Sequence, residues 1–180
     1  MFKRNLLAVC SGFMLSTAWG LTDTASHDII MNVNEVAMLK VNDSSMISLT
    51  VVAPNEGGEV PVLVSNTTKM LQYTSVVAVG ATRKITAGWA SGSSPKGTKL
   101  NVTATSPIGG NKRGIGTSYD FINLSAGAGN VVTGIGSCAT GFGGGSGASL
   151  TYTLSVEDPE LLEAGESKTV TVTYTMTDAS

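Results

Sequence analysis

The sequence predicts an all-β protein built as an antiparallel β-sandwich of about 8–10 strands, and three observations predict it. In the run 168–178, Val170, Val172, Tyr174 and Met176 alternate with threonines. Because side chains of a strand point alternately to its two faces, this run has one apolar and one polar face. Similar short runs recur between turn-forming residues, and no segment has a convincing helical spacing of apolar residues. The runs differ in length, which favours a sandwich over a closed barrel.

Each expected strand is a short run of alternating or β-branched residues bounded by turn signals. These runs span 28–33, 36–41, 46–52, 60–64, 71–79, 83–90, 100–104, 119–124, 131–135, 150–156 and 168–178. Pro61 directs its strand towards a sheet edge, because proline cannot donate to a ladder. The segments 106–118 and 136–149 are rich in glycine and are expected to be exposed loops. At most one helical turn is expected, at 160–164.

The first 20 residues have the layout of a secretory signal peptide. Lys3 and Arg4 precede a short apolar run, and Ala18-Trp19-Gly20 supplies small residues where a signal peptidase reads. We expect cleavage after Gly20, with a site nearer Ser26 as the alternative. The expected organisation is therefore a signal peptide at 1–20, a flexible terminus at 21–27 and a single β-sandwich domain at 28–180, with no transmembrane segment in the mature chain.

Charge and cysteine content exclude several classes of protein. The full chain has a net charge of −2, and the mature chain has about −4 because Lys3 and Arg4 leave with the leader. Nucleic acid is not an expected partner, since no basic stripe is present. Cys138 is the only cysteine after residue 20, so no internal disulfide can form. We expect its thiol to be buried rather than paired with another chain.

The residue types do not predict an enzyme, a metal site or a cofactor. The only histidine, His27, falls in the flexible terminus, where it cannot serve a triad or a zinc site. The acidic run 157–166 could bind calcium, but it lacks the regular spacing of such loops, so a solvated loop is favoured. The glycine-rich segments lack the Lys-Ser/Thr ending of a phosphate loop. Trp89 could form a sugar platform, but its phase with aliphatic residues favours the core.

The chain resembles bacterial secreted β-sandwich proteins of the pilin-like kind, such as fimbrial subunits and spore-coat-U-like proteins. The resemblance rests on the short signal peptide, the alternation of Ile29, Met31 and Val33 after a polar terminus, the Gly/Thr/Ser/Val-rich body, and the ending Gly-Glu-Ser-Lys-Thr-Val-Thr-Val-Thr-Tyr-Thr at 165–175. It implies an Ig-like (pilin-like) sandwich whose N-terminal strand completes the sheet of a neighbouring subunit. The chain departs from the classical pattern in lacking a cysteine pair and in having Ala179 at the penultimate position.

Two functions follow as hypotheses. The first is a non-enzymatic exported structural or adhesive subunit, secreted to the periplasm, the outer surface or an extracellular fibre, whose partners are other copies of itself or related subunits. The resemblance implies Ile29, Met31 and Val33 as the donor strand and Val170, Val172, Tyr174 and Met176 as the edge strand that accepts it. The alternative is a monomeric carbohydrate-binding module with Lys112 and Arg113 in its ligand loop. Exposure of Trp89 would favour the module, and burial would favour the subunit.

Overall fold

The computed structural model describes residues 23–107, 110, 114–118, 122–124 and 127–179. The chain divides into two units, Met1–Asn32 and Val33–Ser180. In the first unit, the described residues 23–32 have no regular secondary structure. The second unit contains every described strand, and it begins five residues later than the domain range 28–180 that the sequence predicts.

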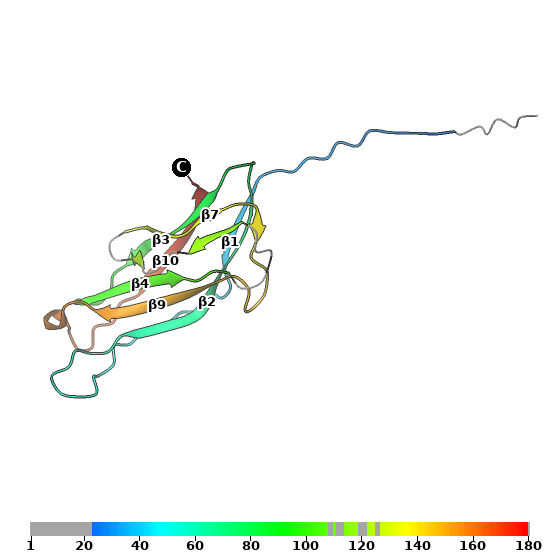
Figure 1. Ribbon diagram of the computed structural model, residues 1–180. Helices are drawn as coiled ribbons and strands as arrows, with labels where there is room; N and C mark the ends of the chain where they lie inside the picture. The colour runs from blue at the N-terminus through cyan, green and yellow to red at the C-terminus, as the bar shows by residue number, and fades with distance from the viewer. Residues whose placement is uncertain (1–22, 108–109, 111–113, 119–121, 125–126, 180) are drawn as a thin grey trace, which may run out of the picture. The chain divides into compact units, whose positions relative to one another are not determined.

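The second unit is an antiparallel β-sandwich, so the predicted all-β fold class is confirmed (Figure 1). The larger sheet has the spatial order β1 (Val36–Val41), β2 (Val64–Val76), β9 (Ala148–Val156), β4 (Thr98–Ala104) and β6 (Ile122–Asn123), and β8 (Cys138–Ala139) also pairs with β2. The smaller sheet has the order β10 (Val170–Asp178), β3 (Arg83–Gly92), β7 (Gly129–Ile135) and β5 (Ile115–Ser118). A 3-10 turn, η2 (Pro159–Leu161), lies between β9 and β10.

The core lies between the two sheets and is formed by alternate residues of their strands. The central strand β9 shows the pattern most clearly, because Ala148, Leu150, Tyr152 and Leu154 are buried while the residues between them are more exposed. Strand β3 contributes Ile85 and Ala87 from the opposite sheet, and the threonines of β10 stay on the solvent face. The period-2 patterns of the sequence therefore place apolar side chains in one shared core.

Several boundaries differ from those expected. Residues 28–33 form no strand, and the expected strand at 46–52 is reduced to an isolated bridge between Val52 and Val62. Of the expected strand at 60–64, Val62 belongs to this bridge and Val64 is the first residue of β2. The expected loops 106–118 and 136–149 contain the short strands β5 and β8. Of the expected strand 119–124, the described residues include only β6. Short polar segments were missed because their pairing depends on a neighbouring strand and not on their own pattern.

Arg83 joins the two sheets at one end of the sandwich. The residue is almost fully buried, at 6% exposed, and its guanidinium donates to the backbone carbonyls of Val36 and Val76 in the larger sheet. It also forms ion pairs with Asp178 at the end of β10, at 2.9 Å, and with Glu35, at 3.1 Å. Strands β1, β2, β3 and β10 are thus held together by one side chain.

We expect Arg83→Ala to lower the free energy of unfolding by about 2–3 kcal/mol, because it leaves buried carbonyl groups without a donor. The measurement is urea unfolding followed by circular dichroism. Lys84→Ala is the matched control: Lys84 is the next residue and faces the opposite side of β3, so its loss is expected to change the free energy by less than about 0.5 kcal/mol. Equal effects of the two substitutions would contradict the joining role of Arg83.

Candidate functional site

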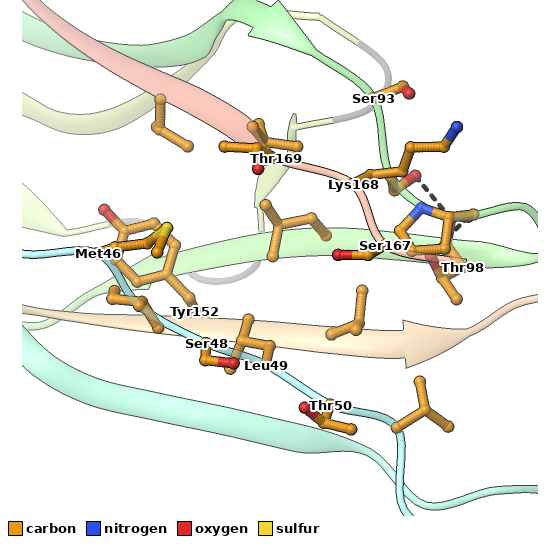
Figure 2. Close-up of a pocket in the computed structure, with 18 of the residues that line it drawn as sticks. Met46, Ser48, Leu49, Thr50, Ser93, Thr98, Tyr152, Ser167, Lys168 and Thr169 are labelled. Atoms are coloured by element: carbon orange, nitrogen blue, oxygen red, sulfur yellow. Dashed lines mark hydrogen bonds between the residues drawn. The ribbon is translucent and has the colours of Figure 1, made fainter. Parts of the chain in front are cut away.

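An open groove of about 1240 Å³ lies beside the first half of β10 in the second unit. We call it the β10 groove. Its first wall is the chain 162–172 together with Tyr174, its second wall is the segment 43–51, and its floor comes from the larger sheet. In Figure 2, Met46, Leu49 and Thr50 mark the second wall, and Lys168 and Thr169 mark the first.

The floor of the groove is apolar. Leu100 of β4 and Leu154 of β9 are register partners, and Tyr152 follows two residues earlier on β9. All three lie at inward-facing positions and are 7–9% exposed. These side chains belong to the core, so a molecule in the groove would extend the core rather than rest on the outer surface.

The β10 wall combines apolar side chains with an unpaired backbone. Val170, Val172 and Tyr174 are half-buried and face inward. Among the described strands, β10 pairs only with β3, so its other edge has no strand partner. Gly92 makes the close β3–β10 approach possible: its φ is +95°, and a Cβ atom there would lie 2.0 Å from the carbonyl oxygen of Thr169.

The second wall retains the alternation of a strand without strand pairing. Ile47, Leu49 and Val51 are half-buried, and the residues between them are exposed. Asn42 explains why the ladder between β1 and β2 stops before this segment. Its backbone nitrogen donates to the carbonyl of Met70 at 2.9 Å, and its side-chain oxygen accepts from the Met70 nitrogen at 2.8 Å. The segment 43–51 that follows is not part of any described strand.

The charged groups at the rim of the groove are compensated by neighbours of the same chain. Lys69, only 4% exposed, donates to Asp43 and to Ser45, each at 2.8 Å. The hydrogen bond from Lys69, followed by those from Ser45, lowers the pKa of the Asp43 carboxyl. At the other end, Lys96 pairs with Glu163 at 2.6 Å. An occupant of the groove therefore needs no charge of its own.

Two tyrosines cross the gap between the sheets at one end of the groove. The hydroxyl of Tyr152, on β9, and the hydroxyl of Tyr174, on β10, are 2.7 Å apart, and either can donate. Burial raises the pKa of both phenols; the hydroxyl pair lowers that of Tyr152 slightly and raises that of Tyr174 further. The pair thus satisfies both hydroxyl groups within the core.

The structure places the sequence-predicted residues in several different settings. Ile29, Met31 and Val33 are 69%, 86% and 86% exposed and lie outside any strand. Val170, Val172 and Tyr174 line the β10 groove, whereas Met176 does not. Lys112 and Arg113 lie outside the described residues.

Other residues singled out by the sequence do not form a site. Cys138 is buried, as expected. Trp89 is partly buried and packs against the core. His27 is exposed outside any strand. Across the described ranges, no group of three or more His, Cys, Asp or Glu residues could hold a metal ion. No helix in the described part of the chain is long and apolar enough to cross a bilayer.

Sequence reasoning missed the second wall, Tyr152 and Lys69 as parts of the site. The alternation at 46–52 was visible, but it indicated a paired strand. Comparisons with known proteins found no matching family model, no similar curated protein and no similar solved structure.

The buried phenols predict a loss of stability in alkali. Burial raises the pKa of Tyr73, Tyr152 and Tyr174 above the ordinary value of about 10. Below pH of about 10 these phenols are neutral in both states and stability does not depend on them. Above it the unfolded chain loses protons that the folded chain keeps, so the free energy of unfolding falls as pH rises.

We expect the double variant Tyr152→Phe/Tyr174→Phe to show a weaker fall. Well above pH 10, the slopes of the two proteins should differ by up to about 2.7 kcal/mol per pH unit, since two titrating groups are removed. Urea unfolding at a series of pH values measures both slopes. Identical slopes would contradict the assignment of these phenols as buried and neutral.

Proposed function

We propose that this protein is a non-enzymatic, exported structural subunit that associates with further copies of itself by strand addition in the β10 groove. The observation that carries the proposal is the combination in one place of an unpaired strand edge and an apolar floor. An extended segment with alternating apolar side chains satisfies both features at once. Its backbone hydrogen-bonds to β10, and its apolar side chains cover the floor.

The chain contains a segment with the required properties. Residues 29–34, Ile-Ile-Met-Asn-Val-Asn, carry no charge and are flanked by Asp28 and Glu35. Ile29, Met31 and Val33 share one face when extended. All three are largely exposed, which is unusual for aliphatic side chains so close in sequence. An uncharged segment suits a groove whose rim charges already have partners.

The energetics favour a segment that uses both kinds of contact. Burying three aliphatic side chains contributes about 5–9 kcal/mol, at about 1.5–3 kcal/mol each. Association costs an amount of the same order through lost translational and rotational freedom. Backbone hydrogen bonds along β10, each contributing about 0.5–1.5 kcal/mol, would therefore decide whether the complex is stable.

Trp89 supports the subunit over the carbohydrate-binding module. An aromatic platform for a sugar needs an exposed ring face, and this indole packs against the core beside β10. The proposed subunit belongs to a surface or fimbria-like assembly outside the cytoplasm, in keeping with the expected signal peptide.

We expect Met31→Asp to weaken self-association at least about 30-fold, or about 2 kcal/mol, because a carboxylate would enter an apolar groove. The measurement is sedimentation or light scattering of the protein expressed from its full sequence. Ile30→Asp is the matched control. Ile30 is as exposed as Met31, at 86%, and introduces the same charge one residue away on the other face. Its effect is expected to stay within about 3-fold.

Strand addition through this segment would be wrong if both substitutions weakened association equally, because a specific strand discriminates between its two faces. It would also be wrong if the unchanged protein remained a monomer at every concentration tested.

A further inference from the structure

Along β9 and β10, the groove ends at Tyr152 and Tyr174, and we call this its closed end. On both strands these tyrosines are the last inward-facing residues that line it. The next inward-facing positions are Leu150 on β9, which is fully buried, and Met176 on β10, and neither lines the groove. In Figure 2, Tyr152 lies on the same side of the view as Met46, whereas Lys168 and Thr98 lie on the other.

The closure is made by side chains of both sheets. Tyr152 extends from the larger sheet and Tyr174 from the smaller one, and their hydroxyl groups meet at 2.7 Å. A strand that advances between the sheets along β10 would have to break this contact. Both hydroxyl groups would then lose their partner in the core, which is costly.

The part of β10 that borders the groove is comparable in length to the uncharged segment. Within β10, the groove runs from Val170 to Tyr174, a span of five residues, which corresponds to roughly 17 Å of extended chain at a rise of about 3.3 Å per residue. The uncharged segment 29–34 has Asp28 before it and Glu35 after it, and its three alternating apolar residues fall within the five positions from Ile29 to Val33. A segment filling this length leaves both carboxylates outside.

We infer that the Tyr152–Tyr174 pair is the stop that sets the register of the inserted strand from a second copy of this chain. The inference rests on the proposed function. In this role the two tyrosines position the inserted strand along β10.

The tyrosine pair and the alternating pattern of the inserted strand exclude different errors of register. A slip of one residue turns Ile29, Met31 and Val33 away from the floor, so the pattern itself excludes odd slips. A slip of two residues restores the correct face, and the pattern cannot exclude it. Towards the closed end, such a slip drives the leading carboxylate against the tyrosine pair. The stop therefore excludes the slips that the pattern permits.

Cross-linking can read the register directly. The acceptor is the full chain carrying Ile29→Ser, Met31→Ser and Val33→Ser, which removes its own donor strand, together with Thr173→Cys on the exposed face of β10. The probes are three synthetic peptides of residues 27–36, each with one cysteine in place of Ile30, Asn32 or Asn34. These positions differ by two residues and face outward when the apolar residues face the groove. An acceptor without Thr173→Cys controls for reaction at Cys138.

We expect one of the three peptides to form at least about ten times more disulfide than the other two. In the acceptor with Tyr152→Leu and Tyr174→Leu, the difference between neighbouring peptides should fall below about 3-fold. If that acceptor fails to fold, Tyr152→Phe/Tyr174→Phe, which retains the rings and removes the hydroxyl contact, should still raise the minor products at least about 3-fold.

The outcomes separate the two ideas. An unchanged product distribution in the tyrosine variants, with the peptides still binding, would overturn the stop and leave strand addition standing. Absence of binding and cross-linking by every peptide would overturn strand addition itself. A loss of stability alone would not redistribute the products among the three positions.

Discussion

The sandwich depends on Arg83, because this residue holds the free edges of both sheets at one end. A buried guanidinium with two carbonyl acceptors and two carboxylate partners allows little freedom to the strands that supply them. Farther along β10, no comparable contact joins its edge to the larger sheet until the tyrosine pair. From the tyrosines towards Val170, no hydrogen bond or ion pair among the described residues ties β10 to the larger sheet, and the β10 groove opens there. The two sheets are thus held together at the Arg83 end, whereas the end with the β10 groove has room for an added strand.

The sequence predicts side-chain direction well and pairing poorly. The alternation at 170–176 correctly placed its apolar residues towards the core, because direction follows from the period of a strand alone. The equally clear alternation at 46–52 did not predict a ladder, because pairing depends on where the segment lies in the fold, and the chain leaves the ladder with β2 at Asn42. The hydroxyl contact of Tyr152 with Tyr174 joins residues of different sheets. It depends on the tertiary packing, which no local pattern contains.

The candidate site was predictable in part for the same reason. One wall of the site, the apolar face of β10, comes from a single continuous segment of the sequence. The rest consists of a floor and a wall brought together from 43–51, β4 and β9. That β10 has a strand on only one side is a property of the topology. A sequence with the same alternation could equally have formed a central strand.

The composition of β10 bears on whether its edge is used. Exposed edges usually carry lysine, proline or inward-pointing charges, because an unprotected edge recruits other strands. Between residues 169 and 177 this chain has none of these: only threonine, valine, tyrosine and methionine occur. β1, one of the edge strands of the larger sheet, contains Lys40. A bulge in the β3–β10 ladder at Thr171 and Val172 adds some local irregularity but no charge.

The edge of β10 thus carries no charge and lies beside an apolar groove, and the same chain exposes an uncharged apolar segment. This combination favours a paired edge in the assembled state. In such an arrangement, specificity has to come from register rather than from repulsion, which is the task that a closed groove end performs.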